Sequence, residues 1–566
     1  MGTDDTMTVK QFFDQASVSF HSVEQIQFAD GTVWDLDEIL RREGQPTQSD
    51  DYLVGTAEDD TIDALGGNDT VIGRAGDDTL NGGAGNDILI GEAGSDTLNG
   101  GTGDDRLSGG PGSDTYTFAR DGGRDSIIDT DTTPGNLDTV IFTDILPSEV
   151  SIARTGNDLV MSVVGTTDSI TLKDCFTATN VHSPVERFQF ADGTVWDTSH
   201  VVTVLLTGTE DANTITGFSS ADTISALGGN DTVFAGAGDD TVDAGAGSDT
   251  IYGEAGDDTI LGGSGSDTLI GGAGNDILLG GDDSDTLAGG AHDDILDGGA
   301  GSDYLYGGSR SVLDDIVGSN GNDRYLFGRG SGLDTVRDPD TTPGNRDTIQ
   351  LADDITAADV TLERKGENLV LSIKDSADRL VVEKWFWNDS SEFQVEQIRF
   401  ADGTTWDVDA IKQMVPVGTA ADDLLLGYAT ADTIQGHDGS DTLYSRAGDD
   451  LLEGGAGWDR LYGDAGNDTL RGGDGQDRLE GGAGDDLLEG GAGRDYLYGG
   501  NSNYGYDWFS SNGNDTYLLG RESGQDIVED YDRTFGNVDT ILVDADVSPE
   551  DVTIRRTGNN LVVSIN

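Results

Sequence analysis

The nine residues GGAGNDILI at positions 82–90 decide the fold of this chain. Gly82, Gly83 and Gly85 permit positive backbone φ angles and close chain approach, so the first six residues predict a turn. The last three predict a short strand, in which the side chain of Leu89 points to the opposite side from its two neighbours. Two such units, eighteen residues, would complete one coil with two parallel strands, whose inward Leu, Ile and Val side chains stack into a narrow core.

This unit recurs in a strict nine-residue phase in three arrays, which together hold 27 nonapeptides. Each nonapeptide carries an aspartate followed two positions later by an apolar residue, and Asn213 is the one departure from aspartate. The aspartates are Asp60, Asp69, Asp78, Asp87, Asp96, Asp105 and Asp114 in the first array, Asp222, Asp231, Asp240, Asp249, Asp258, Asp267, Asp276, Asp285, Asp294 and Asp303 in the second, and Asp423, Asp432, Asp441, Asp450, Asp459, Asp468, Asp477, Asp486 and Asp495 in the third. A phase held this long is the sequence signature of a repeat architecture.

Segments without the nonapeptide phase separate the arrays, and they resemble one another. Residues 173–197 and 383–407 align and both end in FADGTxWD, residues 9–35 match only the tail of this unit, and residues 515–566 match only its front half. We therefore expect an excerpt of a longer tandem protein. Short runs of alternating apolar and polar residues and the D-G turn of FADGTVW predict antiparallel hairpins. Stretches such as DVDAIKQM predict short helices that lead into the next array.

The composition excludes several classes of partner. The chain has 108 acidic and 31 basic residues and a formal charge of −77, which disfavours nucleic acid and anionic membrane surfaces. A single Cys excludes an intrachain disulfide, and no apolar run is long enough to span a membrane. The N-terminus lacks the pattern of a signal peptide, so we expect either an intracellular protein or export by a route that reads no such signal.

The coil geometry converts the aspartate phase into a metal-site prediction. Asp69 should lie over Asp87, and Asp87 over Asp105, so that two carboxylates and several free turn carbonyls face one gap. Left empty, such a gap costs free energy through like-charge repulsion and unpaired carbonyls. A hard cation with six to eight oxygen ligands suits it, whereas Mg²⁺ demands a stricter octahedron and zinc prefers His or Cys. The alternative that needs no metal is an Asx turn closed by each aspartate.

The repeats and the segments between them both resemble a known family. The pattern GGxGxDxUx is similar to the RTX (repeats-in-toxin) calcium-binding nonapeptide, and the intervening segments look like the haemolysin-type calcium-binding related domain. The resemblance covers nearly the whole chain. It implies a parallel β-roll, Ca²⁺ between the turns, and secretion by a type I system to the extracellular space or the bacterial cell surface.

We accordingly predict an all-β chain of three parallel β-roll blocks alternating with small, mainly antiparallel β domains. The expected parts are the C-terminal portion of an inter-roll β domain with a linker (1–50), roll 1 (51–116), an inter-roll domain (117–205), roll 2 (206–327), an inter-roll domain (328–416), roll 3 (417–519) and the N-terminal portion of a further inter-roll domain (520–566).

The arrays offer roughly 15–21 calcium sites, since each site needs two stacked turns. Filling 21 of them would take the formal charge from −77 to about −35. Sites that use the turn at 218–221, which lacks a late glycine, or the turns with Asp283 and His292 in glycine slots, should be weaker. Two stretches, 309–323 and 501–515, break the phase and are expected to be capping loops, with Trp508 packed beneath one of them.

One face of the rolls is richer in aromatic residues than the other. Read in steps of eighteen, it carries Phe234, Tyr252 and Tyr306 in the second array and Tyr444, Tyr462 and Tyr498 in the third. Ordinary cross-strand ladders would explain this pattern. The competing hypothesis is that the face packs against a neighbouring roll, the intervening domain or another chain.

No catalytic motif is present. HExxH, GxSxG and GxxxxGK[ST] are all absent, and the five histidines, at 21, 182, 200, 292 and 437, fall in no ligand spacing. We therefore expect a non-enzymatic protein. Two functions remain open: a structural or adhesive surface scaffold stiffened by calcium, or the repeat region of a larger secreted enzyme or toxin.

Overall fold

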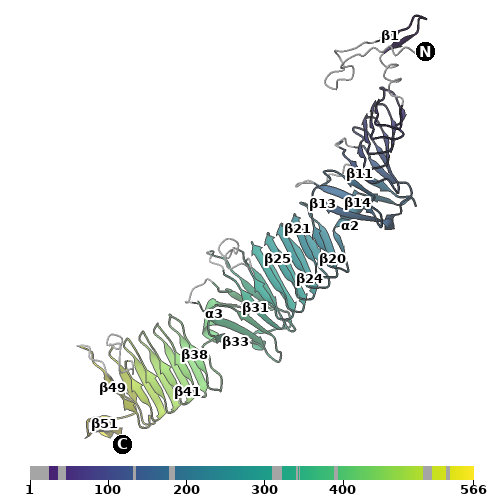
Figure 1. Cartoon of the computed structure of the whole chain (residues 1–566). Helices are drawn as coiled ribbons and strands as arrows, with labels where there is room; N and C mark the ends of the chain where they lie inside the picture. The colour runs from purple at the N-terminus through teal and green to yellow at the C-terminus, as the bar shows by residue number, and fades with distance from the viewer. Residues whose placement is uncertain are drawn as a thin grey trace. The chain divides into compact units, whose positions relative to one another are not determined.

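The computed structural model describes residues 25–35, 46–129, 131, 135–176, 185–308, 321–339, 342, 344–387, 393–500, 513–530 and 536–566. Two compact units contain residues Met1–Thr259 and Ile260–Asn566, and the chain passes from one to the other within β24 (Thr259–Ser264). Strands account for nearly all regular structure in both units, which confirms the all-β prediction (Figure 1).

The first unit contains the first roll and the start of the second. One sheet of the first roll has the order β17 (Val195–Asp197), β16 (Arg187–Gln189), β12 (Thr139–Phe142), β10 (Thr115–Phe118), β8 (Thr97–Thr102), β6 (Thr79–Ala84), β4 (Thr61–Asp63). Its second sheet has the order β13 (Val150–Thr155), β14 (Asp158–Val163), β15 (Ser169–Leu172), β11 (Arg124–Ile127), β9 (Arg106–Ser108), β7 (Ile88–Ala93), β5 (Thr70–Ala75), β3 (Tyr52–Val54). The second roll begins with β18 (Thr207–Thr209), β20 (Thr223–Leu227) and β22 (Thr241–Asp243) in one sheet, and β19 (Thr214–Thr216), β21 (Thr232–Ala237) and β23 (Thr250–Ala255) in the other. A separate hairpin pairs β1 (Gln25–Gln27) with β2 (Val33–Asp35).

The second unit continues with the same two-sheet arrangement. Its first pair of sheets has the orders β26 (Ile277–Asp282), β28 (Ile295–Ala300), β30 (Arg324–Phe327), β32 (Thr348–Leu351), β36 (Gln397–Arg399), β37 (Thr405–Asp407), and β25 (Thr268–Ala273), β27 (Thr286–Ala291), β29 (Tyr304–Tyr306), β31 (Leu333–Arg337), β35 (Arg379–Val382), β34 (Asn368–Ile373), β33 (Val360–Lys365). The third roll has β38 (Leu424–Leu426), β40 (Thr442–Tyr444), β42 (Arg460–Tyr462), β44 (Arg478–Glu480), β46 (Tyr496–Tyr498), β48 (Ile527–Val528), and β39 (Thr433–Asp438), β41 (Leu451–Gly457), β43 (Thr469–Gly475), β45 (Leu487–Gly493), β47 (Thr516–Leu519), β49 (Thr540–Val543). The hairpin of β50 (Val552–Thr557) and β51 (Asn560–Ile565) follows.

Each coil takes eighteen residues, as the sequence predicts. In β5 and β7, Thr70 pairs with Ile88 and Val71 with Leu89, and the two strands run parallel. Many strands are longer than the three residues expected, because pairing resumes beyond the first glycine of the turn, as between Ala75 and Ala93. Consecutive strands therefore fall in alternate sheets, and the strands of each roll stack in parallel rows (Figure 1).

The core is a single file of apolar side chains between the two sheets. The residue two positions after each array aspartate fills it. Apart from Ile62 in the first coil, which is partly buried, these side chains are almost fully buried, as Leu80, Leu89 and Leu98 show with 0% exposure. Their predicted inward direction is confirmed. Because the file is one side chain wide, each coil depends on its neighbours for burial.

The segments after the first two arrays extend the rolls. β10 pairs in parallel with both β8 and β12, and β11 pairs in parallel with both β9 and β15. The predicted antiparallel hairpins follow, formed by β13 with β14 and by β16 with β17, and the second unit repeats them in β33 with β34 and β36 with β37.

The predicted short helices are also present. α2 (Thr198–Leu205) and α3 (Val408–Met414) each follow the FADGTxWD hairpin, and the side chains of Asp197 and Asp407 cap their first turns. Both helices are too short to cross a membrane, and no helix in the described part of the chain is longer than these two. Trp508, His21, His182 and most of the two expected capping loops lie outside the described residues.

Candidate metal centre

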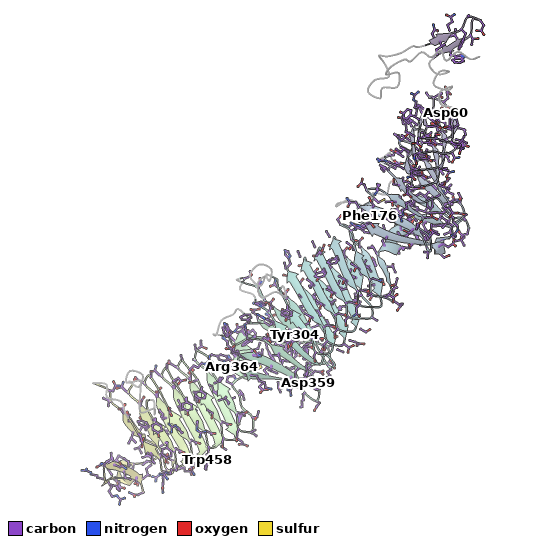
Figure 2. The ribbon with its side chains drawn as sticks, in the orientation of Figure 1. Asp60, Phe176, Tyr304, Asp359, Arg364 and Trp458 are labelled. Atoms are coloured by element: carbon purple, nitrogen blue, oxygen red, sulfur yellow. The ribbon has the colours of Figure 1, made fainter. Side chains whose placement is uncertain are left out.

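A ladder of hydrogen bonds runs along the turns of every array. The backbone N–H of Asp69 donates to Oδ1 of Asp87 over 2.7 Å, and the N–H of Asp87 donates to Oδ1 of Asp105 over 2.7 Å. Asp60, labelled in Figure 2, donates in the same way to Asp78 over 2.7 Å. The bond recurs between aspartates eighteen residues apart in all three arrays. The fold therefore brings the predicted site residues together one coil apart.

The second carboxylate oxygen, Oδ2, lies buried along most of each ladder and accepts no hydrogen bond from the residues that the structure describes. This holds for Asp69, Asp78, Asp87, Asp96, Asp105, Asp114, Asp231, Asp240, Asp285, Asp294, Asp303, Asp441, Asp450, Asp459, Asp468, Asp477, Asp486 and Asp495. The equivalent side chains of Asp249, Asp258, Asp267 and Asp276 are buried in the same slots. A buried acceptor without a donor costs free energy, so these oxygens call for a cation or a proton.

Glycine keeps open the space that each Oδ2 faces. A Cβ atom built on Gly454 would lie 2.6 Å from Oδ2 of Asp459 and 2.6 Å from the carbonyl oxygen of Gly472, in the next coil. A carboxylate oxygen and a carbonyl oxygen from successive coils thus face one small space. Such a set of oxygen donors, without nitrogen or sulfur, fits the preference of Ca²⁺.

Burial raises the pKa of these carboxyl groups. Loss of hydration raises the pKa of Asp96 and Asp105 to about 6 and that of Asp240 and Asp468 to about 7. The hydrogen bond from the preceding coil lowers each pKa, and the neighbouring aspartates raise it, but burial dominates. Without a cation, these side chains therefore keep their protons only up to about pH 6 or 7.

The first aspartates of the arrays behave differently, because no earlier coil of the array precedes them. Their Oδ2 atoms accept a hydrogen bond from the backbone N–H four residues earlier and close their own turn, as the metal-free alternative predicts. They are Asp60, Asp222, Asp423 and Asp432. For these four, no unsatisfied oxygen points to a metal.

The irregular turns of the second array keep the regular backbone path. Asp283 and His292 adopt φ angles of 76° and 82°, in the left-handed region that glycine favours. Oδ2 of both Asp285 and Asp294, in the same two nonapeptides, remains buried without a hydrogen-bond partner. The substitutions therefore strain the turn without filling the space beside the carboxylate.

The ladder also continues onto residues that the nonapeptide phase does not predict. Asp114 donates from its N–H to Oδ1 of Asp138 over 2.7 Å, and Asp138 donates to Oε2 of Glu186 over 2.8 Å. In the second unit Asp323, Asp347 and Glu396 repeat the arrangement. The one available signal is the Asp-Thr pair that opens many of the array strands and recurs at Asp138 and Asp347.

Comparison with known proteins places both kinds of segment in described families. The RTX calcium-binding nonapeptide repeat matches residues 47–80, 81–116, 205–233, 216–251, 234–269, 243–278, 279–309, 417–452, 437–470, 453–488 and 471–504. The haemolysin-type calcium binding protein related domain matches residues 1–38, 158–200 and 368–410. Together the two families match more than half of the chain, and the matched repeats are calcium-binding repeats.

Two individual proteins are similar over part of their length. Iron-regulated protein FrpA of Neisseria meningitidis serogroup C is 37% identical over 105 residues, which is 18% of this chain and 9% of FrpA. The crystal structure of the extracellular lipase LipA from Serratia marcescens is 14% identical, with 62% of this chain and 41% of LipA covered and a TM-score of 0.15, too low to bear on the fold. The chain thus spans less than a tenth of its curated relative. By its repeats and its intervening segments, the chain belongs to the RTX-type calcium-binding repeat proteins with haemolysin-type calcium-binding related domains.

Proposed function

We propose that this chain is an extracellular calcium-binding protein whose rolls fold on Ca²⁺ after export, and that it acts as a structural or adhesive scaffold at a surface or in a matrix. The observation that carries the proposal is the row of buried Oδ2 atoms without hydrogen-bond donors. In many coils this oxygen faces a space that also receives a carbonyl oxygen of the next coil, as at Gly454 and Gly280.

The array aspartates whose buried Oδ2 closes no turn of its own, with the glycine carbonyls beside them, would hold the ions. Bound Ca²⁺ would supply positive charge where carboxylates from successive coils converge. Roughly 15–21 ions would reduce the formal charge from −77 to about −35 at the upper figure.

Folding and metal binding are then coupled. Without the cation, each coil must bury carboxyl groups that keep their protons only up to about pH 6 or 7, as for Asp96 and Asp240. At the low calcium concentration of the cytosol the arrays would stay open, which suits passage through a type I exporter. At the higher calcium concentration outside the cell they would close into rolls.

Circular dichroism of the full chain tests this proposal. The far-ultraviolet spectrum should gain β-structure when Ca²⁺ is added to metal-free protein and lose it again with a chelator. Mg²⁺ at the same ionic strength is the matched control and should leave the spectrum close to the metal-free one, because it demands a stricter octahedron. A spectrum that chelator and calcium both leave unchanged would contradict the proposal.

The scaffold role rests on the repetition of roll and intervening segment, and we propose no catalytic role for the chain itself. The alternative is the non-catalytic repeat region of a larger secreted enzyme or toxin. The observation that favours it is the length of FrpA, of which the similar stretch is only 9%. A full-length sequence with a catalytic or pore-forming segment would decide for the alternative.

A further inference from the structure

Each roll ends on a second kind of acidic cluster, outside the nonapeptide pattern. The three clusters, called end clusters below, are Asp114, Asp129 and Asp138; Asp323, Asp338 and Asp347; and Asp515, Asp530 and Asp539. Within each cluster, one oxygen of every carboxylate lies within 4.8 Å of the others. The second and third aspartates of each cluster belong to no array.

A tyrosine recurs at a fixed position in each cluster. The hydroxyl of Tyr116 donates to Oδ2 of Asp129 over 2.5 Å, and the amide of Gly109 donates to the same hydroxyl over 2.8 Å. Tyr325 and Tyr517 make the equivalent bond to the aspartate thirteen residues later, over 2.8 Å and 2.9 Å. The third aspartate of each cluster lies nine residues after that aspartate in all three copies. The spacing is therefore constant although the loops before these tyrosines differ in length.

Independently of the clustering, Asp114 presents a buried oxygen that has no donor. The side chain of Asp114 is 0% exposed, its Oδ1 accepts the N–H of Asp96, and its Oδ2 has no hydrogen-bond partner. Asp129 and Asp138 are also buried, with 7% and 2% exposure. No Lys or Arg forms an ion pair with these three carboxylates within the described parts of the chain.

The second copy shows where the oxygens converge. A Cβ atom on Gly307 would contact Oδ2 of Asp323 and the hydroxyl of Tyr325, and would lie 3.0 Å from Oδ1 of Asp338. In a regular coil the equivalent glycine, Gly280, faces one carboxylate oxygen and one carbonyl oxygen. At the roll end, a tyrosine hydroxyl and an additional carboxylate replace that carbonyl around the space that glycine leaves open.

We propose that each end cluster binds a Ca²⁺ ion of its own, in addition to the ions between the nonapeptide turns. Three carboxylates and a phenol oxygen form a hard, all-oxygen donor set with more negative charge than a regular coil offers. The tyrosine is a positioning residue, because its hydroxyl fixes the second aspartate of each cluster beside the first. The inference rests on the proposed function only for the identity of the ion.

Ion counting on the full chain tests the inference. The end variant carries Asp129→Asn, Asp338→Asn and Asp530→Asn together, and the bound calcium per chain is measured by elemental analysis after equilibrium dialysis at fixed free Ca²⁺. The end variant should bind three ions fewer than the parent, one for each cluster. An end variant that binds as many ions as the parent would overturn the inference, and would show that the clusters share protons instead.

The matched control replaces three exposed aspartates on the same end coils. Asp104→Asn, Asp293→Asn and Asp485→Asn alter side chains that accept backbone N–H bonds at the surface, and this variant should keep the full ion count. A parent chain that binds no calcium at all would instead overturn the proposed function, so the two failures are distinguishable.

A second variant covers the case in which the end variant loses its β-structure. Tyr116→Phe, Tyr325→Phe and Tyr517→Phe together retain every carboxylate but remove the phenols that would sensitise a lanthanide at the end clusters. Terbium emission excited through tyrosine should fall in this variant relative to Tyr304→Phe, an exposed tyrosine of the regular roll. Emission equal to that of Tyr304→Phe would overturn the inference.

Discussion

The regular coils and the end coils both place carboxylates from successive coils around one space, but they use different residues. In the middle of the first roll, Asp87 accepts the N–H of Asp69 with Oδ1 and leaves Oδ2 buried, one coil of eighteen residues away from its neighbour. At the end of that roll, Asp114 donates to Asp138, which is 24 residues away, and Asp129 enters from the loop between them. The ladder is conserved in form while the nine-residue phase is lost.

The difference shows what a roll needs at its last coil. A middle coil has a glycine turn on each side. The last array aspartate, Asp114, has a loop on one side, which brings Asp129, and the hydroxyl of Tyr116 in β10 donates to Asp129. These groups add negative charge and oxygen donors to the site at the last coil, where no glycine carbonyl of a following nonapeptide is present. We therefore expect the end coils to depend on cation binding more strongly than the middle coils.

The largest expected difference between the middle coils and the end coils is in how the stability of the metal-free chain depends on pH. The pKa of Asp96, in a middle coil, is raised to about 6, and the pKa of Asp125, beyond the array, is raised to about 8, in both cases mainly by burial. The folded chain then holds protons that the unfolded chain has released. This stabilisation is complete below about pH 4, and each proton contributes at most about 1.4 kcal/mol per pH unit. It is lost as the pH rises through about 6 for Asp96 and about 8 for Asp125.

Thermal melts followed by circular dichroism check this prediction in metal-free buffer that contains a stabilising osmolyte, which restores folding of the rolls without calcium. The melting temperature should fall as the pH rises from 4 to 9, whereas in saturating Ca²⁺ it should fall on acidification, because protons compete with the ion. Asp125→Asn should flatten the metal-free curve between pH 6 and 8, and Asp96→Asn should leave that window unchanged. A metal-free melting temperature that rises across this range would contradict the assignment.

The effect of a single Asp-to-Asn substitution on the stability of a middle coil should change sign when calcium is added. In Asp459→Asn, Oδ1 can still accept the N–H of Asp441, a bond of 2.8 Å, but the unsatisfied charged oxygen is gone. Without calcium we expect the variant to be more stable by about 1–2 kcal/mol, since a buried charge is removed. With calcium it should be less stable by about 3 kcal/mol, because a ligand is lost.

Denaturant titrations measure both values, one in saturating Ca²⁺ and one with chelator and a stabilising osmolyte that restores folding of the metal-free rolls. Asp449→Asn is the matched control, since Asp449 is exposed and accepts the N–H of Asn467 at the surface, and it should stay within about 0.5 kcal/mol of the parent in both conditions. A loss of stability of similar size with and without calcium would mean that Asp459 acts only through its hydrogen bond.

Most of the regular roll could be predicted from the sequence, because everything in it is set by the period. A nine-residue phase fixes the inward side chain of Leu89, the pairing of Thr70 with Ile88 and the stacking of Asp69 on Asp87. These contacts depend only on neighbours eighteen residues away.

The roll ends were not predictable in the same way. The contact of Asp138 with Asp114, and that of Glu186 with Asp138 across 48 residues, depend on loops of irregular length, and no period indicates them. The sequence predicts turn closure by an aspartate only as a general alternative to metal binding. It does not show that Asp60 closes its own turn, because it does not show which coils lack a neighbour. The nonapeptide phase places Tyr116, two positions after Asp114, among the core residues, whereas its bond to Asp129 depends on the loop.

The smallest expected effect concerns the aromatic face of the regular coils. Tyr444 and Tyr462 stack with ring centroids 4.6 Å apart and planes 6° apart, and Phe234 and Tyr252 stack likewise at 5.0 Å. This arrangement is the cross-strand ladder that the sequence allowed, and it is compatible with a further partner on the same face. In Tyr444→Ser we expect a loss of about 1 kcal/mol from the broken stack. If the face also mediates association between copies of the chain, sedimentation should show weaker association in Tyr444→Ser/Tyr462→Ser than in Gln435→Ser, a substitution on the opposite face. Equal association in the two variants would limit the aromatic residues to a role within their own roll, as the ladder alone requires.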